Sequence, residues 1–146
     1  MKLIFNRLTQ FISVVAIISG LLLYSSCKKE AGPIIVLPAN PPKISFANEI
    51  QPIFTPKCAS AGCHKGGTPA GNLNLEAGNS YTNLVNVPAN YGTAILVVPS
   101  VAGSSVLWHK VADTGIYGGV MPMAGPLQSF EQDLIKKWIN EGALNN

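Results

Sequence analysis

The sequence predicts a small, mostly helical domain that follows an export signal and a proline-rich tether. Three stretches predict the helices: residues 48–54, a short segment at 104–111, and residues 129–141, where apolar side chains recur at helical spacing. The loop at residues 118–126 is rich in glycine and proline and cannot be regular helix. Because no internal repeat is visible, we expect a single domain.

The chain begins with the pattern of a secretory signal peptide over residues 1–26. Lys2 and Arg7 precede an apolar stretch at residues 11–23, which is too short to span a membrane comfortably. The small residues that follow, ending in Cys27, resemble the lipobox of bacterial lipoproteins. This resemblance implies that Cys27 is lipidated and becomes the first mature residue. The alternative is an ordinary signal peptide or uncleaved anchor with a free cysteine.

The resemblance to lipoproteins also implies a location. The protein would be exported and held at the periplasmic face of a bacterial membrane through its lipid anchor. Lys28 follows the anchor cysteine, where an acidic residue is associated with retention in the inner membrane. We therefore expect the outer membrane.

Cleavage changes the size and the charge of the protein. Removing residues 1–26 from the 146-residue chain leaves 120 residues, and the loss of Lys2 and Arg7 lowers the formal charge from +3 to +1. A nearly neutral chain without a basic face excludes nucleic acid as an expected partner. Residues 27–44 form a linker that three prolines make semi-rigid, and residues 45–146 form the domain; the prolines are Pro38, Pro41 and Pro42.

The first predicted helix opens the domain. Asn48 suits the N-cap, and Glu49 suits the positive end of the helix. Ile50, Ile53 and Phe54 share one face, so we expect this face to be buried and the helix to lead the chain into the cysteine loop.

The cysteine loop carries the chemistry that the sequence indicates. Cys58, Cys63 and His64 form C-x4-C-H, two residues longer than the C-x-x-C-H of covalent haem attachment. The residues at 59–62 are all small, and glycine adopts backbone angles that a longer loop requires. Alternatively, the two cysteines form a disulfide beside a surface histidine. A zinc site is weaker, because only His109 could complete the ligand set.

The loop and helix after residue 100 offer candidates for a second iron ligand. Met121 and Met123 lie in the glycine- and proline-rich loop, although either could equally fill a gap in the core. His109 could replace methionine, but a histidine beside lysine on a short helix is more often solvent-facing. Trp108 and Tyr117 could line a haem pocket or simply pack in the core.

The closing helix is the strongest local prediction. Ser129 and Gln132 form a capping box, and Gly142 marks the C-terminal stop. The apolar side chains at helical spacing are Phe130, Leu134, Ile135, Trp138 and Ile139. We expect Trp138 to pack across the first helix.

These segments, taken in order, resemble the small class I-type cytochrome c domains of exported bacterial proteins. The resemblance covers about residues 45–143 and is closest to the divergent group with four residues between the haem cysteines. Its carriers are Phe46, Ile50-Gln-Pro-Ile-Phe54, Lys57-Cys58-x4-Cys63-His64, Gly71-Asn-Leu-Asn-Leu75, Tyr81-x-x-Leu84-Val85, Val97-Val98-Pro99, Ser104-Ser105-x-Leu107, Met121-Pro122 and Trp138-Ile-Asn-Glu-Gly-Ala143.

The resemblance implies a compact, mostly helical fold wrapped around one covalent haem c. Cys58 and Cys63 would form the thioethers, His64 would be the proximal iron ligand, and Met121 would be the distal one, with Met123 as its alternative. The expected function is electron transfer between redox partner proteins, without an enzymatic activity. The alternatives are a haem peroxidase or gas sensor, and a haemless exported binding module stapled by a Cys58–Cys63 disulfide.

Overall fold

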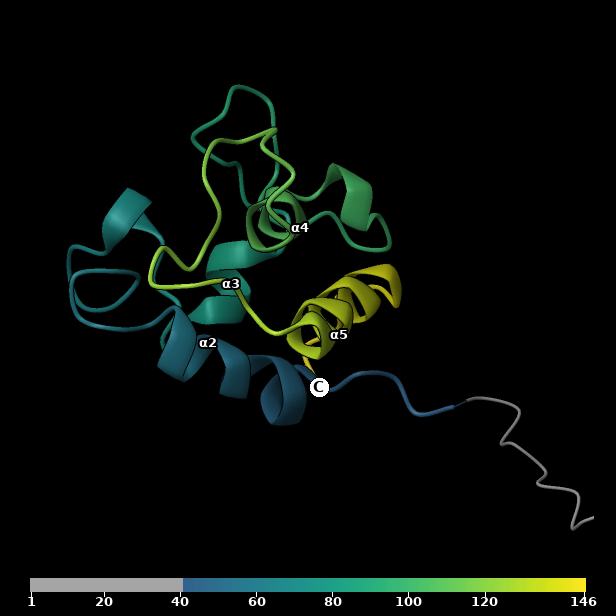
Figure 1. Cartoon of the computed structure of the whole chain (residues 1–146). Helices are drawn as coiled ribbons and strands as arrows, with labels where there is room; N and C mark the ends of the chain where they lie inside the picture. Colours follow the sequence, from purple (N-terminus) through teal and green to yellow (C-terminus); the bar gives the residue numbers. More distant parts are fainter. Residues whose placement is uncertain (1–40) are drawn as a thin grey trace, which may run out of the picture. The chain divides into compact units, whose positions relative to one another are not determined.

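Residues 41–146, which a computed structural model describes, form a mostly helical domain with four α-helices and without strands (Figure 1). The helices are α2 (Gln51–Lys57), α3 (Ser80–Leu84), α4 (Val106–Val111) and α5 (Ser129–Asn140), with shorter helical turns at Phe46–Ile50, Ala70–Asn72 and Ala102–Ser104. The signal peptide, Cys27 and most of the linker lie outside the described residues. Within the described part, no helix is long and apolar enough to cross a membrane.

The first helix begins earlier than the sequence predicts. A wide π-type turn, Phe46–Ile50, runs directly into α2, and Ser45 is the N-cap. The Ser45 hydroxyl accepts a bond from the Asn48 amide at 3.2 Å, and the Ser45 amide donates to Glu49 Oε2 at 2.7 Å. Asn48 therefore lies inside the first turn, and its assignment as the N-cap is wrong. Serine is an equally good cap, and its reciprocal bonds with the first turn decide the start.

The predicted buried face of this helix is confirmed. Ile50, Ile53 and Phe54 are all buried in one hydrophobic core. Phe46 stands at the centre of an aromatic cluster in this core, with ring centroids 5.2 Å from Trp138, 5.3 Å from Tyr81 and 6.2 Å from Phe54. The expectation that Trp138 packs across the first helix is therefore confirmed.

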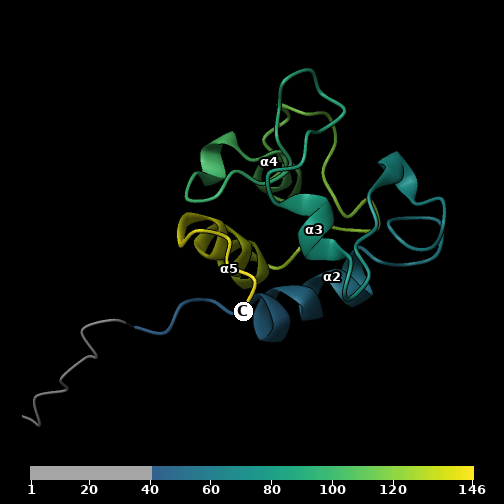
Figure 2. The same ribbon diagram turned by 180° about the vertical axis from the view of Figure 1, so that it is seen from behind.

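Helix α5 closes the domain and ends as predicted. Gly142 has a φ of +107°, its amide donates to Ile139 O at 3.0 Å, and the Ala143 amide donates to Trp138 O at 2.9 Å. These two bonds form a Schellman motif, which satisfies the last carbonyls of the helix. The chain end lies beside the start of the first helix in both views (Figure 2), where the Ala47 amide donates to Asn146 O at 2.9 Å.

The start of α5 differs by one residue from the prediction. Gln128 is the N-cap, and its backbone amide donates to Glu131 Oε2 at 2.8 Å in a capping box. Ser129 is the first helical residue, so the predicted pair of Ser129 with Gln132 is wrong. A charged carboxylate accepts a stronger bond than a neutral amide does, and this favours Glu131 as the partner three residues into the helix.

Candidate functional site

The C-x4-C-H loop is tightly folded against the end of α2. The Cys58 amide donates to Phe54 O at 2.8 Å and so continues the helix into the loop. The His64 amide then returns to Cys58 O at 3.1 Å. Gly62 has a φ of +79°, a conformation that side chains with a Cβ rarely adopt. The expectation that glycine supplies an unusual backbone angle inside the longer loop is therefore confirmed.

The His64 ring is oriented by two backbone carbonyl oxygens. Its Nδ1 lies 3.1 Å from Ala70 O and 3.1 Å from Leu73 O. Because carbonyl oxygens only accept hydrogen bonds, Nδ1 must carry the hydrogen, which assigns the tautomer by its partners. The lone pair of Nε2 is then free for a metal, and this is the arrangement found at metal-ligating histidines, whose second nitrogen is fixed by a carbonyl or carboxylate.

The segment that supplies these carbonyls is itself anchored to the helices. The Leu75 amide donates to His64 O at 2.9 Å, closing the segment back onto the histidine. The buried Ser80 hydroxyl lies 2.8 Å from Leu75 O and 2.6 Å from Gln51 Oε1, which joins α3 to α2 at this point. The Asn83 side-chain amide donates to Asn74 O at 3.0 Å. The orientation of the imidazole is thus determined by the fold.

One cavity of about 330 Å³ is lined by the five residues for which the sequence resemblance implies haem attachment or iron ligation. Cys58, Cys63 and His64 contribute to its lining from the cysteine loop, and Met121 and Met123 contribute from the glycine- and proline-rich loop. Its volume lies within the range of sites for small molecules and cofactors. Most of the remaining lining is apolar and includes Leu75, Leu84, Leu96, Val106, Leu107 and Val111.

The two methionines differ in their environment. The Met121 amide donates to Lys110 O at 2.9 Å, which ties the loop to α4, and the side chain is half-buried. Met123 also lines the cavity but is 80% exposed. The position of Met121 therefore suits a fixed ligand better than the position of Met123 does.

The two thiols are free, and one of them is buried enough to change its acidity. Burial, the neighbouring Cys63 and the Glu131 carboxylate together raise the pKa of Cys58 to about 11. Burial raises the pKa of a thiol because it disfavours the charged thiolate, and nearby negative charge acts in the same direction. Cys58 is therefore held as a neutral thiol at neutral pH. Glu131 also lies 4.0 Å from Lys57 Nζ.

His109 is held away from this cavity. Its Nε2 lies 2.8 Å from Gly103 O and its Nδ1 lies 2.9 Å from Thr114 Oγ1, so both ring nitrogens have partners. The ring packs edge-on against Tyr117 at 5.5 Å. His109 is partly exposed and does not line the cavity. The geometry also does not support His109 as an iron ligand.

The aromatic lining differs from the one that the sequence suggests. Trp108 packs against the core beneath Lys136, whose Nζ lies 4.8 Å from the ring centroid, and it does not line the cavity. Tyr117 does not line it either, but its ring contacts that of Tyr91, which does, in a tilted arrangement with the centroids 5.2 Å apart. The loop that carries Tyr91 gives no periodic signal in the sequence. Its bridge of Pro88 with Ile95 and the bond from the Ala89 amide to Ala94 O at 2.8 Å close the loop in the fold.

Within residues 41–146, no three His, Cys, Asp or Glu side chains converge as a metal site. No family model matches the chain, and no curated protein or solved structure matches it.

Proposed function

We propose that the chain is a membrane-tethered monohaem c-type cytochrome that transfers electrons between redox partner proteins and is not an enzyme. The observation that carries the proposal is the cavity shared by Cys58, Cys63, His64 and Met121. These residues come from two loops that lie more than fifty positions apart in the sequence. An apolar cavity with two thiols, a fixed imidazole and a thioether supports a covalently attached haem.

Each residue has a defined role in this proposal. Cys58 and Cys63 supply the thiols that form thioethers with the vinyl groups of the macrocycle. His64 presents Nε2 to the iron, while its Nδ1–H remains bound to the carbonyls of Ala70 and Leu73. This second bond keeps the ring in one orientation and increases its basicity as a ligand.

Met121 would supply the second iron ligand. A methionine thioether is a soft ligand, and together with histidine it raises the reduction potential of the iron. When bound, the haem supplies a one-electron ferric–ferrous couple. The apolar residues around it, such as Leu84 and Val106, exclude water and favour the less charged reduced form. Because His64 and Met121 would both be iron ligands, this donor set favours electron transfer over catalysis.

The location belongs to the same proposal. Cys27 carries the lipid anchor, and the linker 27–44 holds the domain at the periplasmic face of the membrane, with the outer membrane expected. The partners are redox proteins in the same compartment, and nucleic acid is not among them.

An absorption spectrum of the chain, expressed with a haem-attachment system, tests this function. We expect a sharp reduced α band, with colour that stays on the polypeptide after acid–acetone extraction. The double variant Cys58→Ala, Cys63→Ala is the control and should lose its colour in the extraction. A colourless wild-type chain would contradict the proposal. Carbon monoxide binding to the native reduced protein would instead support the sensor or peroxidase alternative.

A further inference from the structure

The cavity has an uneven distribution of charge. Among the described residues, its lining contains no Asp or Glu and two lysines, Lys57 and Lys110. The other titratable side chains around it are Cys58, Cys63, His64 and Tyr91. A cavity whose charged lining is cationic suits a ligand that carries negative charge.

The two lysines differ in whether their charge already has a partner. Lys57 is 44% exposed and lies 4.0 Å from the Glu131 carboxylate. Lys110 lies in no ion pair within residues 41–146. Its Nζ donates to Gly119 O at 3.3 Å and stands 5.4 Å from the centroid of the Tyr91 ring. Both contacts hold the ammonium group in place without neutralising it, so Lys110 is available for a carboxylate.

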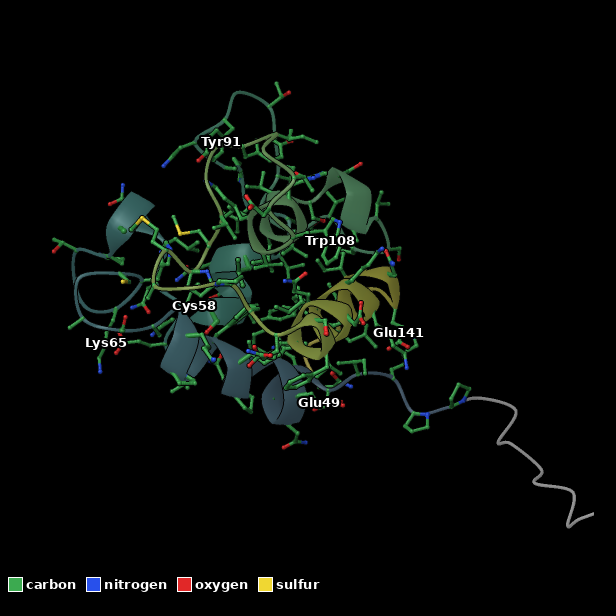
Figure 3. The ribbon with its side chains drawn as sticks, in the orientation of Figure 1. Glu49, Cys58, Lys65, Tyr91, Trp108 and Glu141 are labelled. Carbon is green, nitrogen blue, oxygen red and sulfur yellow. The ribbon has the colours of Figure 1, made fainter. Side chains whose placement is uncertain are left out.

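Lys110 and Tyr91 mark a different part of the cavity from the cysteine loop. In Figure 3, Cys58 lies near the end of α2, whereas Tyr91 lies on the loop at the top of the view. Two residues that are apart in a projected view are at least as far apart in space, so Tyr91 and Cys58 lie at different ends of the view. The haem macrocycle has the same polarity, because its vinyl groups are on one side and its propionate carboxylates are on the other.

We propose that Lys110 binds a propionate carboxylate of the haem. This inference rests on the proposed function. Tyr91 supports the lysine by placing its ring beside the ammonium group. A lysine paired with a half-buried carboxylate stabilises the carboxylate anion and lowers its pKa, so the carboxylate stays charged at lower pH.

The test is the reduction potential of the haem-loaded full-length chain, measured as a function of pH for the wild type and three variants. Ionisation of a propionate adds negative charge near the iron. The reduction potential therefore falls as the pH rises through the pKa of that propionate. Lys110→Gln removes the cation, and we expect the carboxylate to bind its proton about tenfold more tightly. The fall in potential should then occur about one pH unit higher than in the wild type. Lys110→Arg should restore the wild-type curve.

Lys65→Gln is the matched control, because Lys65 is exposed and follows the histidine ligand but does not line the cavity. The pH at which the potential of this variant falls should coincide with that of the wild type. If Lys110→Gln behaves like Lys65→Gln while both carry haem, this inference is wrong and the proposed function stands. A wild-type chain without covalent haem overturns both. If Lys110→Gln takes up haem poorly, Lys110→Met, which keeps the side-chain length, is titrated against the same expectation.

Discussion

Replacing Phe46 by leucine should destabilise the domain strongly, because its ring is the centre of the aromatic cluster. Phe46 is 5% exposed, and its ring lies 5.2–6.2 Å from the rings of Trp138, Tyr81 and Phe54. Aromatic pairs of this geometry each contribute about 0.5–1.5 kcal/mol beyond the burial of area. Leucine keeps most of the buried area and loses all three pairs. We therefore expect the free energy of unfolding to fall by about 2–3 kcal/mol.

Urea denaturation followed by far-ultraviolet circular dichroism measures this loss. With a slope of about 1–3 kcal/mol per molar urea for small proteins, the midpoint should fall by about 0.7–3 M. The matched control is Phe130→Leu, since Phe130 lies on α5 and is 63% exposed. This control should change the free energy of unfolding by less than about 0.5 kcal/mol. Equal midpoints for the two variants would refute the assignment of Phe46 to the core.

Two further predictions concern the site. In the oxidised haem-loaded protein, Met121→Ala should abolish the weak charge-transfer band between methionine sulfur and ferric iron, whereas Met123→Ala should keep it; the reverse pattern would assign Met123 as the ligand. In the haem-free chain, the pKa of Cys58, raised to about 11 by burial, Cys63 and Glu131, keeps the thiol protonated at neutral pH. Its alkylation by iodoacetamide, followed by mass spectrometry, should therefore accelerate until about pH 11. Glu131→Gln should shift this profile to lower pH, and a profile that levels off near pH 8.5 would contradict the burial of Cys58.

Three of the four described α-helices were predictable because their signals are local, whereas α3 (Ser80–Leu84) was not predicted. Ile50 and Trp138 occupy apolar positions at helical spacing, and both are buried. The errors are at the helix starts, where several polar residues compete for the same free amides. Ser45 was preferred over Asn48 because it also exchanges a bond with the first turn, and Gln128 precedes Ser129 as the cap because Glu131 provides a charged acceptor.

Of the residues that line the cavity, the sequence pointed most clearly to those of the C-x4-C-H loop. Cys58 and His64 belong to a motif, so the sequence alone singles them out as candidates. Tyr91 and Lys110 belong to no sequence motif. The loop that carries Tyr91 is closed by single bridges such as Pro88 with Ile95, and its contact with Lys110 on α4 exists only in the folded domain. The restraint of His64 by backbone carbonyls was also invisible, since every residue has a carbonyl and only the fold selects Ala70 and Leu73.

The central claim is that Cys58 and Cys63 hold a haem covalently. The most direct measurement is the mass of the intact protein, followed by the mass of the peptide that contains both cysteines, after expression with a haem-attachment system. We predict that the protein gains the mass of one haem and that this mass remains on that peptide. A peptide without added mass, or one lighter by two hydrogens because Cys58 and Cys63 form a disulfide, would contradict the claim.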